Sequence, residues 1–176
     1  MLKRNHPLVE ALVASLESEA RHQRQYIALV QQEKEAVVKF RTDDVKKLSK
    51  KREDLTQKIL SSQRERIEIV KKILKEEKLN LNSVKITKLA DTVMGGKDRE
   101  RVKKAAAILK ELISISKNKT KELEGIVGFS MKLVSGSLSA IVSATYDLNT
   151  MYMPNGRVKR HQVPVARSAR HIARTA

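Results

Sequence analysis

The sequence contains no cysteine and no tryptophan, and only 3% of its 176 residues are aromatic. Without cysteine, disulfide bonds and thiolate metal sites are excluded, which fits a protein of the reducing cytoplasm. With so few aromatic side chains, any hydrophobic core must be built from aliphatic residues. We therefore expect the core to be elongated rather than globular.

Residues that break helices are also scarce, since the chain has three prolines and six glycines. A chain otherwise rich in Leu, Lys, Glu, Ala and Ile is typical of an all-α fold. The four histidines show no i,i+4 pairing, and no residue pattern sets a nucleophile beside a base. We expect no metal, no cofactor and no enzymatic activity.

A long apolar run is missing as well. No such run follows Met1–Asn5, so no signal peptide is predicted. The most apolar window, residues 125–146, is interrupted by Lys132 and five serines. We therefore do not expect a transmembrane span.

The formal net charge is +17, which would suit nucleic acid or an anionic membrane. Residues 157–176 contribute six Lys or Arg and no acid, so the remainder holds 31 bases and 20 acids. Charges of both signs are interspersed along the predicted helices, as on a solvated surface. We expect no specific nucleic-acid binding, and we expect residues 157–176 to form a disordered basic tail.

Two helices of similar length are predicted in the first half of the chain. Pro7 suits a first helical turn, and the apolar pattern continues from Leu8 to Phe40. After a turn at Thr42-Asp43-Asp44, a second helix is predicted from Asp44 to Glu77. The tight connection favours an antiparallel hairpin, in which Arg52 and Arg66 interrupt the inner side of the second helix.

A short helix is predicted after the loop at residues 80–83, ending at Gly95-Gly96. One long helix is then predicted from about Asp98, because no proline occurs before Pro154. It would contain roughly 55 residues and measure about 80 Å. Together these helices form a predicted elongated, coiled-coil-like domain over residues 1–156, followed by the tail 157–176.

Apolar residues at helical spacing form one stripe in the second half of this long helix. The members that concern function are Val127, Met131, Val134, Leu138, Ile141, Val142 and Leu148, and Tyr152 follows on the same side. Such a stripe is most often internal core. The hairpin, however, is about 50 Å long, which would leave roughly 30 Å of the long helix for lipid or a protein partner.

Several segments resemble the FlgN family of flagellar type III export chaperones. They include Leu12, Leu16, Glu19 and Tyr26 in the first helix, and Thr42-Asp43-Asp44 leading to Val45-Lys46-Lys47-Leu48. Leu109-Lys110-Glu111-Leu112 and Asn118 continue the similarity in the long helix. The most distinctive segment, Tyr152-Met153-Pro154-Asn155-Gly156, is similar to the family's Tyr–x–x–Asp/Asn–Gly motif, and the resemblance covers about residues 8–160.

The resemblance implies a cytoplasmic, ATP-independent chaperone that holds the terminal amphipathic helices of the hook-associated proteins FlgK and FlgL. It further implies transient delivery of the client to the membrane export apparatus, with Tyr152 docking on the gate component FlhA. The seven stripe residues would then bind the client. Without a client the stripe would favour self-association into a homodimer.

Two other functions fit the same residues. One is a nucleic-acid-binding or structural helical coiled coil that uses the basic surface. The other is a chaperone for a different secreted filament protein.

Overall fold

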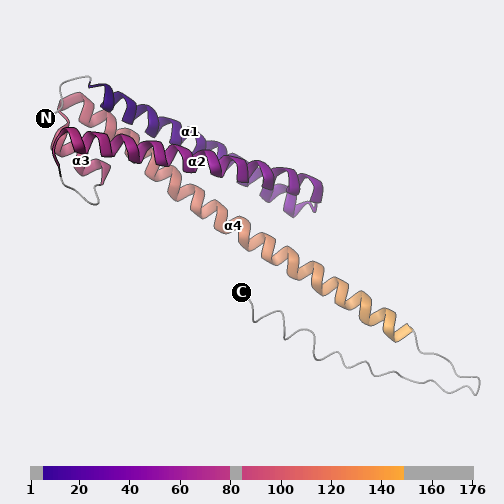
Figure 1. Ribbon diagram of the computed structural model, residues 1–176. Coiled ribbons are helices and arrows are strands. Elements are labelled where there is room, and N and C mark those ends of the chain that lie inside the picture. The colour runs from indigo at the N-terminus through magenta and orange to yellow at the C-terminus, as the bar shows by residue number, and fades with distance from the viewer. Residues whose placement is uncertain (1–5, 80–84, 149–176) are drawn as a thin grey trace, which may run out of the picture. The chain divides into compact units, whose positions relative to one another are not determined.

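The computed structural model describes residues 6–79 and 85–148, with side chains described as far as residue 143. These residues form four helices: α1 (Pro7–Val38), α2 (Thr42–Glu76), α3 (Ile86–Val93) and α4 (Gly96–Leu148) (Figure 1). The all-α prediction is confirmed, with α1 and α2 as a hairpin, a short α3 and a long α4. The predicted tail and the Tyr152-to-Gly156 segment lie outside the described residues.

The two ends of the α1–α2 hairpin follow from local chemistry. Pro7 occupies the start of α1 as predicted, and the His6 ring Nδ1 accepts a hydrogen bond from the Leu8 N–H at 3.3 Å. At the other end, Phe40 takes a left-handed φ of 52°, and the Arg41 N–H donates to the Ala36 carbonyl.

The predicted start of α2 at Asp44 was two residues late. The left-handed Phe40 already reverses the chain, so α2 begins at Thr42 and the acidic pair Asp43 and Asp44 falls in its first turn. Their carboxylates suit the positive end of the helix dipole. No side chain caps the α2 N-terminus.

Aliphatic side chains from all four helices form the main core, within the first of two compact units, which ends at Ser130. Its fully buried members include Leu12 and Leu16 from α1, Ile73 from α2, Leu89 from α3 and Val102 from α4. A second, smaller cluster joins Val30, Val37 and Leu123, with Tyr26, Val45, Ile126 and Val127 packed around it. The aliphatic composition of the core was predicted.

Two carboxylates are buried on the inner side of α1, and each pairs with an arginine of α2. The Arg66 Nε donates to Glu19 Oε2 at 2.8 Å, and the Arg52 Nε donates to Glu33 Oε2 at 2.7 Å. Glu33 also accepts a hydrogen bond from the Ser49 hydroxyl. Arg52 and Arg66, which the sequence placed on the inner side of α2, are therefore neutralised by charge on the facing helix.

These two ion pairs specify the register of the hairpin. Glu33 lies two heptads after Glu19, and Arg52 lies two heptads before Arg66, so both pairs form in the same antiparallel alignment. A slip of one heptad would place Glu19 opposite Ile59 and leave a buried carboxylate without a cation, which is strongly unfavourable.

The long helix α4 begins two residues before the predicted Asp98, at Gly96, whose φ of +40° is easily adopted by glycine. It continues without interruption for 53 residues, or about 80 Å, as predicted. The second compact unit of the chain begins within this helix, at Met131.

Candidate functional site

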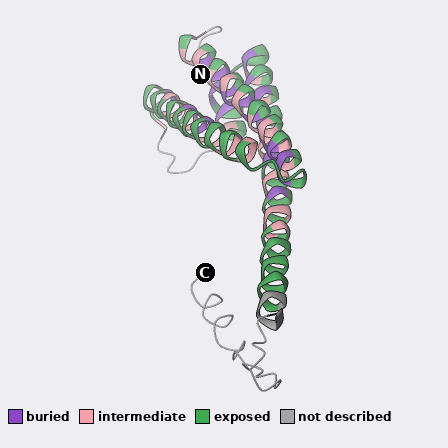
Figure 2. Cartoon of the chain, turned by 90° about the vertical axis from the view of Figure 1, so that its right-hand side faces the viewer, coloured by how far each residue is buried: buried purple, intermediate pink, exposed green. Residues whose placement is uncertain are grey.

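The described side chains of the second unit all belong to one exposed helical segment. Every residue from Met131 to Ser143 is exposed (Figure 2). The predicted stripe accounts for five large side chains here, which retain 47–66% of their accessible surface: Met131, Val134, Leu138, Ile141 and Val142. We call these five residues the α4 apolar face. Water is a poor environment for such a group of aliphatic side chains, so the face is a candidate binding surface.

In the first unit, the corresponding side of α4 is covered. Leu123 is buried against Val30 and Val37, and Val127 is half-buried beside them. Met131 and Val134 follow Leu123 and Val127 at helical spacing. The sequence pattern of an internal core thus continues into a segment whose residues are exposed.

Polar contacts between α1 and α4 accompany this last covered turn. The Tyr26 hydroxyl lies 3.3 Å from the Thr120 hydroxyl, and Lys34 Nζ lies 3.2 Å from Glu122 Oε2. Hydrogen bonds from Lys34 and Lys119 lower the pKa of the Glu122 carboxyl below its usual range. These contacts fix α1 against α4 just before the α4 apolar face begins.

The predicted client-binding and docking residues do not all lie in the same environment. Five form the α4 apolar face, whereas Val127 belongs to the edge of the smaller core cluster. The side chain of Leu148 and the whole of Tyr152 lie outside the described residues.

Two further exposed apolar residues of α4 lie outside the predicted stripe. Phe129 keeps 68% of its accessible surface, and Leu133 is also exposed. At 100° per residue they lie on the side of the helix away from Met131, so a search for one stripe does not include them. Their signal in the sequence was an i,i+4 pair of large apolar residues in a segment without acids.

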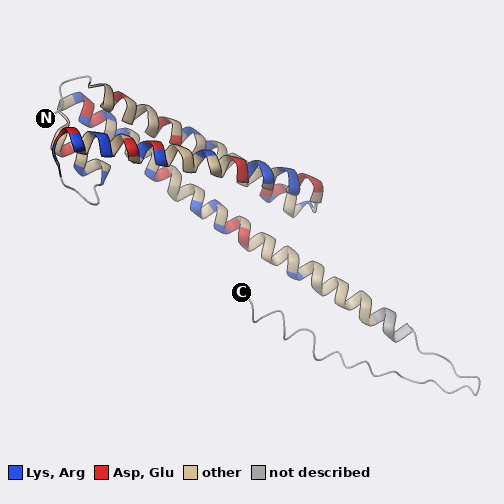
Figure 3. Ribbon diagram, in the orientation of Figure 1, with Lys and Arg blue, Asp and Glu red and all other residues tan. Residues whose placement is uncertain are grey.

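Most of the other residues of this segment have small, uncharged side chains. Lys132 is the one charged residue between Gly125 and Ser143 (Figure 3). A side-chain carbon at Gly125, Gly128 or Gly136 would meet no other atom within 4 Å. By length and composition alone, α4 includes a window apolar enough to cross a membrane, and none of that window is buried.

The described residues contain no group of three His, Asp or Glu side chains that could hold a metal ion. The structural feature that stands out is the α4 apolar face.

Comparison with protein families gives a match that spans most of the chain. The family described as FlgN protein matches residues 1–160. This chain belongs to the FlgN family. No curated protein and no solved structure matches it.

FlgN family membership makes this protein a flagellar export chaperone that is cytoplasmic and not an enzyme, and whose clients are hook-associated proteins. The predicted resemblance is confirmed, and the match begins seven residues earlier than expected. Two residues of that resemblance have clear structural roles, since Glu19 forms the buried pair with Arg66 and Tyr26 contacts Thr120.

Proposed function

We propose that the chain binds a terminal amphipathic helix of FlgK or FlgL along the second half of α4 and carries it to the export gate. The client would contact Val127, Met131, Val134, Leu138, Ile141, Val142 and Leu148. The observation that supports this proposal is that every residue from 131 to 143 is exposed, with five large apolar side chains on one face.

In the proposed mechanism, the client helix packs against the α4 apolar face and replaces the water that surrounds it. An amphipathic client helix buries its own apolar stripe against the α4 apolar face, so neither stripe remains in water. Full burial of one such side chain is worth about 1.5–3 kcal/mol, and these five are roughly half exposed, so the face would contribute about 4–8 kcal/mol before ordering costs. Binding of that size is reversible and needs no ATP for release.

The test replaces single exposed residues by aspartate. Leu138→Asp or Ile141→Asp places a charge in the buried interface, which should weaken client binding by about 2–3 kcal/mol, or roughly 30- to 150-fold. Binding is measured by calorimetry with a purified C-terminal segment of FlgK or FlgL.

Ser139→Asp is the matched control, because Ser139 is exposed in the same turn but lies away from the face. It should leave affinity within about threefold, and all three variants should keep wild-type circular dichroism since none of these side chains is buried. Equal affinity of Leu138→Asp and wild type would refute the proposal, as would unfolding caused by that substitution.

Docking of the loaded chaperone on FlhA is the second part of the proposal, and Tyr152 is its candidate residue. Support comes from the family match, which includes this segment, and from the chemistry of a tyrosine, whose apolar ring and hydroxyl suit interface anchors. Tyr152→Ala should retain client binding and lose binding to the FlhA cytoplasmic domain. If FlhA affinity is unchanged while the melting temperature falls, the tyrosine serves packing instead. This docking would account for transient association with the membrane export apparatus.

Without a client, the same face would favour a homodimer. Sedimentation velocity should then show a dimer that dissociates on client addition and is absent in Leu138→Asp. A wild-type monomer at tens of micromolar would exclude this state.

A further inference from the structure

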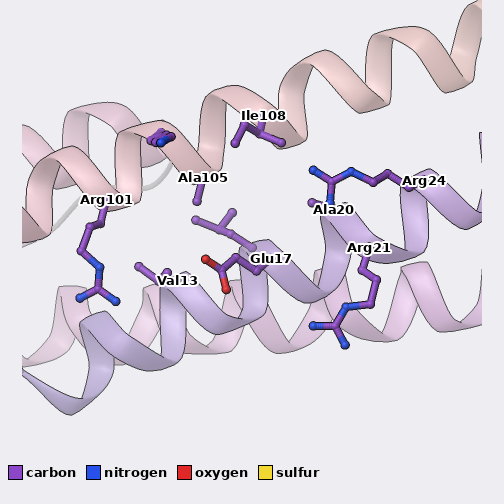
Figure 4. A pocket seen from close by; sticks show the side chains of 10 residues that line it. Val13, Glu17, Ala20, Arg21, Arg24, Arg101, Ala105 and Ile108 are labelled. Carbon is purple, nitrogen blue, oxygen red and sulfur yellow. The ribbon is translucent and has the colours of Figure 1, made fainter.

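A groove between α1 and α4 combines an apolar floor with a cationic rim (Figure 4). It has a volume of about 450 Å³ and lies wholly within the first unit, away in sequence from the α4 apolar face. Val13, Leu16 and Ala20 of α1 line the floor together with Ala105 and Ile108 of α4. Because two of these residues are alanines, one on each helix, the helices leave space between them for an incoming side chain.

Four cations surround this floor. Arg21 and Arg24 stand on α1, and Arg101 and Lys104 stand on α4, in each case three residues apart. Arg101 is neutralised, since both its terminal nitrogens donate to the Glu10 carboxylate. Arg21, Arg24 and Lys104 form no ion pair with any residue that the structure describes.

One carboxylate, Glu17, also lines the groove. The hydrogen bond to Glu10 is the main cause that raises the pKa of Arg101, and the charge of Glu17 adds to it. The three unpaired cations outweigh this acid, so the rim has a net positive charge on both sides of the floor.

We propose that this groove is a second docking surface, which takes an acidic amphipathic helix of a partner protein. An aliphatic side chain of that helix would enter between Ala20 and Ala105. Acidic residues on either side of its apolar stripe would meet Arg21 and Arg24 on one helix and Lys104 on the other.

The ligand must combine two chemistries. A nucleic acid supplies the negative charge but no aliphatic side chain for the floor, and it would bind equally to the other cations of this basic chain. The α4 apolar face of a second copy does not combine them, because the segment of α4 from Met131 to Ser143 holds one lysine and no acid. The proposed groove therefore calls for another protein, and it does not rest on the client-binding role of the α4 apolar face.

The probe is a synthetic helical peptide with leucine at positions i, i+4, i+7 and i+11 and glutamate on both sides of that stripe. Fluorescence anisotropy with the full-length chain should show saturable binding. A peptide with lysine in place of glutamate, and one with serine in place of leucine, should each bind at least about tenfold more weakly. Equal binding of either control peptide would overturn the proposal.

Variants locate the site by charge. Arg21→Glu combined with Arg24→Glu should weaken the acidic peptide on the order of tenfold or more, because attraction becomes repulsion. Lys47→Glu with Lys50→Glu is the matched control, with the same charge change and spacing on exposed α2 positions. Glu17→Gln should act in the opposite direction and strengthen binding. If the control pair weakens binding as much as the arginine pair, the interaction is general electrostatics and the proposal fails.

A second set of variants tests the floor without changing charge. Ala105→Leu fills the groove and should weaken peptide binding several-fold, whereas Ala107→Leu adds the same volume on an exposed side of α4 and should not. The arginine variants are repeated in the Leu138→Asp chain, which separates the groove from the α4 apolar face. An effect of the arginine pair on duplex DNA or phosphatidylglycerol vesicles, without an effect on the peptide, would assign the cations to another ligand and refute the inference.

Discussion

Replacement of Arg66 by methionine should destabilise the hairpin markedly. The substitution keeps an unbranched apolar stem and removes the cation that pairs with Glu19 at 2.8 Å. The Glu19 side chain has no exposed surface, and its Oε1 already has no hydrogen-bond partner, so the variant buries a carboxylate with neither oxygen satisfied.

The size of the effect follows from this burial. Removing one partner of a fully buried ion pair costs about 3–5 kcal/mol. Arg66 is 21% exposed, so water screens the site in part and we expect about 2–3 kcal/mol. At roughly 2–4 °C per kcal/mol for a chain of this size, the melting temperature should fall by about 4–12 °C.

The assay is urea denaturation followed by circular dichroism, with two controls. Arg64→Met changes an exposed arginine on the same helix and should shift stability by less than about 0.5 kcal/mol. The double variant Glu19→Leu with Arg66→Met removes both charges and should recover most of the loss, because a buried pair is often replaced by apolar residues without cost. If Arg66→Met is no more destabilising than Arg64→Met, the pair does not hold the hairpin and the argument for its register is wrong.

Two further predictions concern the termini of the folded region. Because a hydrogen bond from Arg101 lowers the pKa of Glu10, Arg101→Gln should raise that pKa toward its ordinary value in an NMR titration. In the wild type, the ionised Glu10 paired with Arg101 stabilises the folded state above the unfolded-state pKa, and this stabilisation is lost as the pH falls through the lowered folded-state pKa. Acid should therefore destabilise the variant less steeply than the wild type. An unchanged Glu10 pKa in the variant would contradict this contact. Truncation after Gly156 should leave the melting temperature within a few degrees, since residues 157–176 are too polar to offset about 1–2 kcal/mol of backbone entropy per ordered residue. A large fall on truncation would show that the tail packs on the helices.

The helices themselves could be predicted from the sequence because their signals are local. Pro7 marks the start of α1, and the absence of proline before Pro154 allows the 53 residues of α4. The predicted starts of α2 and α4 were each two residues late. In both cases a residue with left-handed backbone, Phe40 or Gly96, makes the turn more tightly than the residue pattern suggests.

The polar part of the core could not be predicted in the same way. A hydrophobic pattern omits charged residues, so Glu19 and Glu33 were not assigned to the inner face of α1 even though Arg52 and Arg66 were placed inside α2. Recognising the pairs requires the alignment of the two helices, which depends on tertiary structure. The same limit applies to the groove, since Arg24 and Lys104 are distant in sequence and only the packing of α1 on α4 brings them together.

The exposure of the α4 apolar face was predicted in part. The stripe in α4 was evident from its helical period. The sequence could not show at which residue the stripe becomes exposed, because Leu123 and Leu138 belong to the same apolar pattern. Burial distinguishes them, with Leu123 at 3% exposure and Leu138 at 57%. Phe129 and Leu133 were overlooked since they lie outside that period.

A client that covers the α4 apolar face should shield it from reagents in solution, and the absence of cysteine in the chain allows this to be measured with an introduced thiol. Leu138→Cys and Ser139→Cys place a unique thiol on the face or beside it, at positions that are both exposed in the free protein. The rate of thiol alkylation is then compared with and without a saturating C-terminal segment of FlgK or FlgL. We expect the client to slow alkylation strongly at position 138 and little at position 139. Client binding that leaves the alkylation rate at position 138 unchanged would show that the client lies elsewhere on the protein.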